Sequence, residues 1–167
     1  MTPSCNIAIL ATLDTKGAEV AAMQDLLRGL GCTATVIDIG PLGPPAIRAD
    51  HGSDEVARLA GWKLDELVRT GQRDRIMEAM GNGAAKLLSL LFFQDRIHGA
   101  IGLGGNQGTA ISATAMRSLP FGFPKYLVST VASGNIRPYV GERDIGMVFW
   151  HGDDLEHRLQ GLHRDHS

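Results

Sequence analysis

Aromatic side chains make up only 5% of the 167 residues, and this scarcity argues against one class of partner. Proteins that bind single-stranded nucleic acid stack the bases on aromatic rings. Basic residues are not in excess either, because the formal net charge is −2, so the sequence lacks the positive surface that duplex nucleic acid requires. We therefore expect no nucleic-acid partner.

Long apolar runs are also missing from the sequence. No stretch approaches the ~20 residues that a membrane-spanning helix needs, and the polar residues Thr2 to Asn6 lead into no signal-peptide pattern. We expect a cytoplasmic protein with no membrane partner. The two cysteines, Cys5 and Cys32, each lie within two residues of the start of a predicted strand. A disulfide between neighbouring strands is compatible with that placement, but without a signal for export we expect two free thiols.

Glycine, by contrast, is abundant at 21 residues, and short apolar runs alternate with segments of helical periodicity. Strands are predicted over residues 7–12, 33–39, 99–103, 124–129 and 145–150. Helices are predicted over residues 17–30, 53–59, 63–70, 73–95 and from 108 or 109 to 117. This alternation predicts an α/β fold with a doubly wound, mainly parallel sheet of about five strands and helices on both faces, a Rossmann-like arrangement.

We expect residues 1–150 to form one nucleotide-binding domain, followed by a polar tail over residues 151–167 that has leucines at loose helical spacing. The helix predicted over residues 73–95 contains Gly81-Asn82-Gly83, although each glycine costs a helix interior about 1 kcal/mol. Three explanations stay open: close packing of the helix on its own sheet, a break between two helices, or a subunit interface. Only this feature favours a homodimer.

The segment after the third predicted strand carries the strongest functional signal. Four of the seven residues from 102 to 108 are glycine. Glycines let backbone N–H groups crowd around an anion, and the following helix adds the positive end of its dipole. The pattern is not the dinucleotide fingerprint, because Gln107 stands where glycine is needed, and it is not a Walker A loop, because no Gly-Lys-Ser/Thr follows. A tight turn is the alternative to phosphate binding. The candidate residues are Gly104, Gly105, Asn106, Gln107, Gly108 and Thr109.

Polar residues also follow the other predicted strands. After the first strand, Lys16 is a candidate counter-charge for phosphate and Asp14 a candidate ligand of Mg²⁺. Asp38 ends the second strand, where dinucleotide-binding folds keep a ribose-binding carboxylate. The alternative after the first strand is a capped helix start with solvated charges, and the alternative at Asp38 and after the fourth strand is an ordinary turn. Because parallel strands end at one edge of a sheet, we expect these residues to converge there. The candidates are Thr12, Asp14, Thr15, Lys16, Asp38, Thr130, Ser133 and Gly134.

Residues for catalysis are less evident. Three histidines, His157, His163 and His166, lie in the polar tail without metal-ligand spacing, so we expect no metal site built from protein ligands alone. The sequence has no Gly-x-Ser-x-Gly elbow and no convincing Ser/His/Asp arrangement. If the domain is an enzyme, Asp14 or Asp38 is the candidate general base.

The same loops resemble those of one family. The stretches IAILATLDTKGAE (7–19), GAIGLGGNQGTAISATAMRSLPFGFPKYLVST (99–130) and ASGNIRPYVGERDI (132–145) are similar to a broadly distributed, uncharacterised family that includes the tomato-mosaic-virus resistance protein of plants. The resemblance spans about residues 6–146. It implies a Rossmann-like N-terminal domain that binds ATP with Mg²⁺ and is usually followed by a second α/β domain. The family's Gly-Gly-Ser-Gly-Gly-Thr pattern is altered here, where Asn106 and Gln107 replace Ser-Gly.

We therefore expect a domain that binds ATP and Mg²⁺, as the N-terminal half of a two-domain protein. One alternative is a hydrolase or lyase that acts on a phosphorylated or carboxylated small molecule through the same loops. Another is a protein-interaction module that its nucleotide stabilises, which predicts exposed apolar residues on the 73–95 helix. An NAD(P) dehydrogenase is the least expected, because the first strand lacks the glycine fingerprint.

Overall fold

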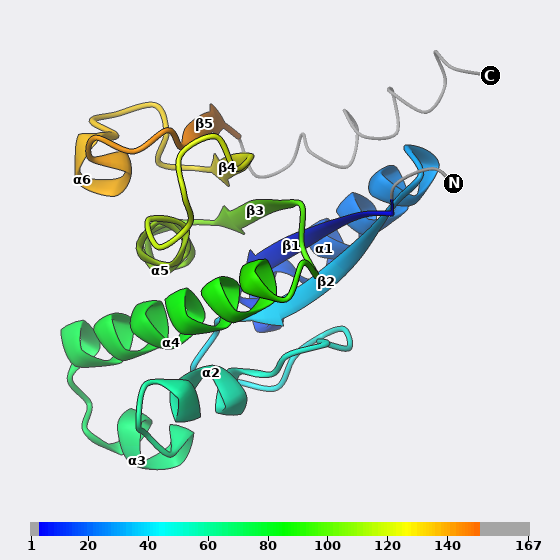
Figure 1. The fold of residues 1–167 in the computed structure, drawn as a ribbon. Coiled ribbons are helices and arrows are strands. Elements are labelled where there is room, and N and C mark those ends of the chain that lie inside the picture. The colour runs from blue at the N-terminus through cyan, green and yellow to red at the C-terminus, as the bar shows by residue number, and fades with distance from the viewer. Residues whose placement is uncertain (1–3, 151–167) are drawn as a thin grey trace.

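The computed structural model describes residues 4–150, which form a five-stranded parallel sheet with the strand order β2-β1-β3-β4-β5. Helices cover both faces of this sheet (Figure 1), so the predicted doubly wound, Rossmann-like α/β fold is confirmed. The predicted tail over residues 151–167 lies outside the described residues. The strands are β1 (Cys5–Ala11), β2 (Cys32–Asp38), β3 (Gly99–Gly104), β4 (Lys125–Ser129) and β5 (Gly146–Phe149). The helices are α1 (Leu13–Gly29), α2 (Ser53–Leu59), α3 (Leu64–Arg69), α4 (Arg73–Phe93), α5 (Asn106–Met116) and α6 (Arg137–Val140).

The strand order reverses direction beside β1, and this reversal fixes where a ligand fits. From β1 the chain goes to β2 on one side, and then crosses back to β3 on the other side. The segments that leave β1 and β3 therefore diverge to opposite faces of the sheet. In doubly wound sheets, the crevice between two such segments, at the carboxyl edge of the strands, is the usual ligand site.

The sheet separates two apolar cores, because successive side chains of a strand point to opposite faces. On β1, Ile9 and Ala11 pack under α1, whereas Ala8 and Leu10 face the core shared by α2, α4 and α5. All four residues have no exposed surface, which explains why this strand is read as a continuous apolar run. The carboxyl end of β1 is thereby held rigidly at the centre of the sheet.

Every predicted strand is present, with ends within two residues of the prediction. Two helices begin earlier than expected. Helix α1 begins at Leu13 rather than at residue 17, and α5 begins at Asn106 rather than at 108 or 109. The residues around Asp14 and Gln107 were expected in loops, but they form the first turns of helices instead. The short helix α6 was not predicted.

The predicted glycine-containing helix is one continuous element, α4, and its glycines pack inside the domain. A Cβ atom on Gly83 would fall on the carbonyl oxygen of Val56 in α2. A Cβ atom on Gly81 would lie 2.9 Å from the side chain of Thr114 in α5. Both glycines therefore let neighbouring helices approach closely. The close packing is against α2 and α5 rather than against the sheet, and α4 is not broken at the glycines. The homodimer stays a prediction, without the support that these glycines lent it.

Helix α4 is also more apolar than the sequence analysis allowed. An 18-residue window of this 21-residue helix has a mean hydropathy of 1.2, which by length and composition alone would suit a membrane-spanning helix. The helix packs against both α2 and α5 and buries Met80, Leu87, Leu88 and Leu91. Its apolar composition is thus explained by its place in the core.

The two cysteines form a disulfide, so the expectation of free thiols is wrong. Cys5 and Cys32 are paired directly across the parallel strands β1 and β2, with their Cα atoms 4.7 Å apart. A distance in this range is what a disulfide requires. The bond joins the amino ends of β1 and β2, at the edge of the sheet opposite the carboxyl ends.

An ion pair between a buried lysine and an exposed aspartate lies at this same amino edge. Lys125, at the start of β4, has a fully buried side chain whose Nζ lies 2.8 Å from Oδ1 of Asp144. The ammonium group also donates hydrogen bonds to the carbonyl oxygens of Pro120 and Phe123. The hydrogen bond from Lys125 to the carboxylate of Asp144, together with one from the Gly122 amide, lowers the pKa of Asp144 below its ordinary value. Lys125 therefore joins the segment that precedes β4 to the segment that precedes β5.

Candidate functional site

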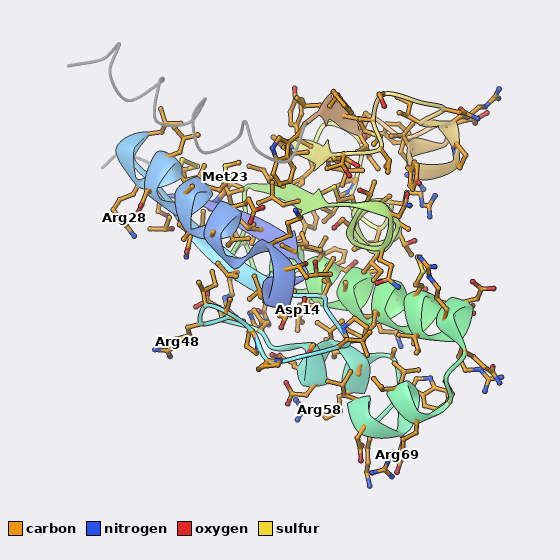
Figure 2. The ribbon with its side chains drawn as sticks, turned by 180° about the vertical axis from the view of Figure 1, so that it is seen from behind. Asp14, Met23, Arg28, Arg48, Arg58 and Arg69 are labelled. Atoms are coloured by element: carbon orange, nitrogen blue, oxygen red, sulfur yellow. A yellow bond between two sulfur atoms is a disulfide. The ribbon has the colours of Figure 1, made fainter. Side chains whose placement is uncertain are left out.

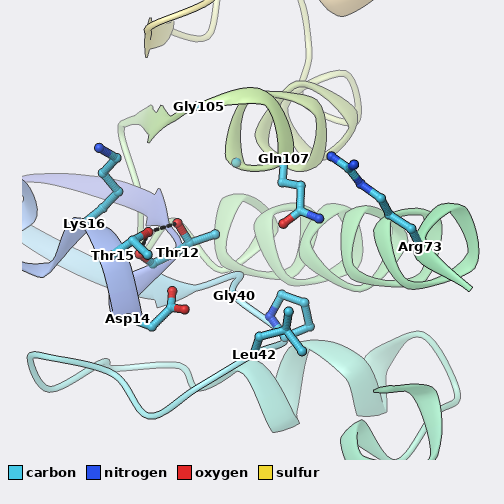
Figure 3. Close-up of a pocket in the computed structure, with 11 residues that line it drawn as sticks. Thr12, Asp14, Thr15, Lys16, Gly40, Leu42, Arg73, Gly105 and Gln107 are labelled. Atoms are coloured by element: carbon cyan, nitrogen blue, oxygen red, sulfur yellow. Dashed lines mark hydrogen bonds between the residues drawn. The ribbon is translucent and has the colours of Figure 1, made fainter. Parts of the chain in front are cut away.

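A pocket of about 460 Å³ lies at the carboxyl edge of β1 and β3, where the strand order reverses. This volume lies within the range of small-molecule sites. Four segments build its wall: the start of α1, the connection after β2, the start of α4 and the start of α5 (Figure 3). The lining residues are Thr12, Asp14, Thr15, Lys16, Gly40, Pro41, Leu42, Arg73, Gly105, Gln107 and Gly108.

The start of α1 and the residue before it bring four predicted residues to the pocket wall: Thr12, Asp14, Thr15 and Lys16. Thr12 precedes the helix, and its carbonyl oxygen accepts hydrogen bonds from the amides of Thr15 and Lys16. The hydroxyl groups of Thr12 and Thr15 are 3.0 Å apart. Figure 2 shows Asp14 at the start of α1, facing the connection after β2, while Arg28 lies at the other end of the helix. Asp14 is the one acidic residue that lines the pocket within the described chain.

Asp38 supports the pocket but does not line it. Its side chain is 3% exposed, and Oδ1 accepts hydrogen bonds from the amides of Leu13 at 3.2 Å and Gly40 at 2.9 Å. Burial raises the pKa of Asp38 above its ordinary value, although the two amide hydrogen bonds partly oppose that effect. The predicted ribose-binding carboxylate is thus engaged in joining the start of α1 to the segment after β2.

At the start of α5, the glycines have separate roles. Gly105 and Gly108 line the pocket. Gly104 is buried, and a Cβ atom there would lie 2.8 Å from Cα of Gly108, so only glycine permits this turn. Thr109 is 1% exposed, and its hydroxyl lies 2.6 Å from that of Ser129 at the end of β4. Thr109 was predicted to contact phosphate, but its hydroxyl instead joins two strand ends.

Lys16 lines the pocket while its ammonium group is directed to other partners. Nζ lies 3.3 Å from the carboxylate of Glu19 and 4.5 Å from the centroid of the Trp150 ring. In Figure 3, the side chain extends away from Gln107 and Arg73. A lysine side chain has enough rotatable bonds to turn toward a bound anion, but in this structure it does not point into the pocket.

The remaining wall of the pocket was not predicted from the sequence. Arg73, the first residue of α4, and the segment Gly40-Pro41-Leu42 line the pocket across from α1. Apolar periodicity could not reveal them, since both belong to the long connection between β2 and β3. One signal was available for Arg73, because a cation at the first position of a helix opposes the helix dipole.

The remaining predicted residues are not brought into the pocket. Asn106 is exposed at the first position of α5, and Ser133 and Gly134 are exposed in the segment after β4. Thr130 does not line the pocket either, although its amide donates to the carbonyl oxygen of Gly104. The third predicted loop therefore does not line the pocket, but Ser129 and Thr130 hold the start of α5 and the end of β3 in place.

Three helices begin at this pocket. Their first turns supply Asp14, Thr15 and Lys16 from α1, Arg73 from α4, and Gln107 and Gly108 from α5. Each helix N-terminus carries about half of a positive elementary charge and backbone N–H groups without partners inside the helix. The combination favours an anion. No cluster of three metal-ligating side chains occurs among residues 4–150, so a cation here would need ligands from the anion besides Asp14.

Comparison with known proteins agrees with the resemblance of these loops. Residues 5–153 match the N-terminal domain of the uncharacterised protein family UPF0261. A UPF0261 protein of Clostridium tetani is 43% identical over 143 residues, which are 86% of this chain and 35% of the relative. A UPF0261 protein of Rhizobium meliloti is 33% identical over 85% of this chain and 35% of the relative.

A shorter stretch of the chain is similar in sequence to a plant protein. The ToMV resistance protein Tm-1(GCR237) of Solanum lycopersicum is 42% identical over 66 residues, which are 40% of this chain and 9% of that protein. The chain spans about a third of the length of the bacterial relatives. The match over residues 5–153 shows that this chain belongs to the UPF0261 family, in which it corresponds to the N-terminal domain.

Proposed function

We propose that this domain binds ATP together with Mg²⁺ in the pocket between β1 and β3. The observation that carries the proposal is the convergence of three helix N-termini on a single pocket at the point where the strand order reverses. Such a site suits phosphate groups, because backbone amides and helix dipoles stabilise negative charge without requiring mobile side chains. The choice of ATP rests on the resemblance of the loops to the family described above.

In this proposal each wall of the pocket has a distinct role. The amides at Gly105, Gln107 and Gly108 bind phosphate oxygens. Asp14 holds Mg²⁺, whose other ligands are phosphate oxygens and water, as is common for this ion. Pro41 and Leu42 give the pocket an apolar side that suits the base. Whether hydrolysis follows binding depends on the whole protein, since the relatives are about three times longer than this chain.

Thermal unfolding with ATP, ADP, GTP, NAD⁺ and inorganic phosphate, each with and without Mg²⁺, tests the proposal. A ligand at 100 times its Kd stabilises the folded state by about 2.7 kcal/mol, which shifts the midpoint measurably. We expect ATP with Mg²⁺ to give the largest shift, and Asp14→Asn to remove the contribution of Mg²⁺. If phosphate or small carboxylates shift the midpoint and no nucleotide does, the hydrolase or lyase alternative replaces this proposal.

A second candidate function, a protein-interaction module, is favoured by the end of α4. Phe93 is 82% exposed and Leu90 is 48% exposed there, and Phe121 is exposed in the segment before β4. Exposed apolar side chains of this size are typical of protein contacts. Sedimentation at increasing protein concentration, with and without ATP, tests this candidate. Self-association that Phe93→Ser abolishes would support this candidate. A protein that stays monomeric at all concentrations would rule out the homodimer.

A further inference from the structure

We infer that Arg73 binds one phosphoryl group of the ligand and makes the site favour a nucleoside triphosphate over a monophosphate. This inference rests on the proposed function, and it adds to it a residue from outside the three sequence loops. Arg73, at the start of α4, thus distinguishes ligands by their number of phosphates, and the glycine-rich turn before α5 does not.

The first observation is where Arg73 lies. It lines the pocket from the first position of α4, and in Figure 3 its guanidinium group extends from α4 toward the side of the pocket formed by Gln107. Thr12 and Thr15 lie on another side of the same pocket, at the start of α1. The guanidinium group of Arg73 and the hydroxyl groups of Thr12 and Thr15 therefore lie on separate sides of one cavity, where both can donate hydrogen bonds to a chain of phosphates.

The second observation is electrostatic. A cation at the N-terminus of a helix lies next to positive partial charge, which disfavours it in the absence of an anion. The neighbouring Gln72 makes no capping hydrogen bond with its side chain, so the first amides of α4 are not satisfied by that residue. An anion held by Arg73 would satisfy both the guanidinium group and this helix end.

The third observation is that the pocket's two cations differ in their partners. Lys16 already pairs with Glu19 and lies over Trp150. Arg73 has no carboxylate within 4.0 Å among residues 4–150. Guanidinium groups bind phosphate oxygens through two parallel hydrogen bonds, which a lysine cannot match. Of the two cations that line the pocket in the described part of the chain, Arg73 is thus the one without an ion-pair partner.

The test compares two arginines on the same helix. Arg73→Gln removes the charge at the pocket, and Arg75→Gln removes an equal charge two residues later. Arg75 is exposed and lines a different hollow, with Trp62 and Glu78. Titration calorimetry gives the Kd values of ATP and AMP in excess Mg²⁺ for the wild type and for both variants. Thermal unfolding without ligand checks that both variants fold.

We expect Arg73→Gln to weaken ATP binding by about tenfold or more, because it loses a charge-assisted hydrogen bond. AMP binding should change by less than about threefold, since only long-range, salt-screened attraction is lost. Arg75→Gln should change neither Kd beyond that limit. The ratio of the AMP and ATP dissociation constants should therefore fall in Arg73→Gln alone.

Failures of the two proposals are distinguishable. If the wild type binds ATP and Arg73→Gln binds it equally well, this inference is overturned and the proposed function stands. Equal losses for ATP and AMP also overturn it, because Arg73 would then not read the number of phosphates. If the wild type binds no nucleotide, both proposals fail together.

Discussion

The ammonium group of Lys16 lies over the indole ring of Trp150, with Nζ 4.5 Å from the ring centroid. The two residues come from opposite ends of the described chain, one from the first turn of α1 and the other directly after β5. Trp150 is 4% exposed, and its amide donates to the carbonyl oxygen of Ser129 at the end of β4. The ring is therefore fixed, and cation–π attraction of about 0.5–2 kcal/mol holds the lysine beside it.

This contact predicts that Trp150 reports ligand binding. If a bound phosphate draws Lys16 away from the ring, the environment of the indole changes and so does its fluorescence. Trp62→Phe leaves Trp150 as the only tryptophan, and titration of that variant with ATP and Mg²⁺ should change the emission in a saturable way. Adding Lys16→Met should remove most of this change. An emission that stays constant while calorimetry detects binding would show that Lys16 does not move.

Two adjacent glycines should have different effects when they are substituted. A Cβ atom on Gly105 has Thr130 Oγ1 as its nearest neighbour, at 3.7 Å, so a β-carbon is accommodated there, and Gly105→Val places its methyl groups at the pocket wall. It should abolish the ATP-dependent rise in melting temperature while leaving the unliganded midpoint almost unchanged. Gly104→Ala meets backbone atoms of Gly108 at 2.8 Å and should lower stability by about 1–3 kcal/mol. A Gly105→Val protein that still responds to ATP would place the phosphates elsewhere.

Gly83→Ala should destabilise the domain although alanine is the better helix former. The substitution gains about 1 kcal/mol in helix propensity. The new methyl group, however, falls on the carbonyl oxygen of Val56, and moving α2 away should cost more than that gain, with a net loss of about 1–3 kcal/mol. Urea unfolding measures the difference. Gly134→Ala, whose nearest atom is Val131 O at 3.9 Å, is the control and should stay within about 0.5 kcal/mol of the wild type.

The raised pKa of Asp38 predicts a specific dependence of stability on pH. Burial raises this pKa above its ordinary value of 3.8, so the folded protein holds the proton more tightly than the unfolded chain. The contribution of Asp38 to stability is therefore complete below pH 3.8 and is lost as the pH rises through the raised pKa. Asp38→Asn keeps an oxygen acceptor for the amides of Leu13 and Gly40 but does not ionise.

The urea midpoints of the wild type and Asp38→Asn, measured from pH 3 to pH 7, test this sign. Relative to the variant, the wild type should lose stability as the pH rises through this window and then level off. A relative gain of stability over the same window would mean that the amide hydrogen bonds outweigh burial, and that the pKa is lowered.

Much of the fold could be predicted from the sequence because its local signals agree with one another. Residues 7–12 and 33–37 are all apolar or β-branched, and the polar residues Thr12 and Asp38 stand at the ends of these runs, so the strands were predicted within two residues. The first turns of α1 and α5 were missed because Asp14 and Gln107 are not apolar and do not contribute to periodicity. A helix can begin with such residues, since its first turn faces the pocket rather than the core.

The candidate site was only partly predictable. Seven of the eleven lining residues belong to the predicted set, because strand ends in a parallel sheet must share an edge. Arg73 and Leu42 depend on the path of the long connection after β2, which tertiary packing determines. Thr109 was a candidate for phosphate contact or for a helix cap because it follows the glycine-rich segment, and its hydroxyl is instead paired with that of Ser129.

The division of the interior into two apolar cores has a consequence for how the domain opens. Helix α1 belongs to one core and α5 to the other, with the sheet between them. Their first turns meet at the pocket, so a ligand bound there contacts both layers at once. The binding free energy is then shared between them, and hydrogen exchange in α1 and α5 should slow together. Two layers that open independently in the free domain would become one cooperative unit when the pocket is filled.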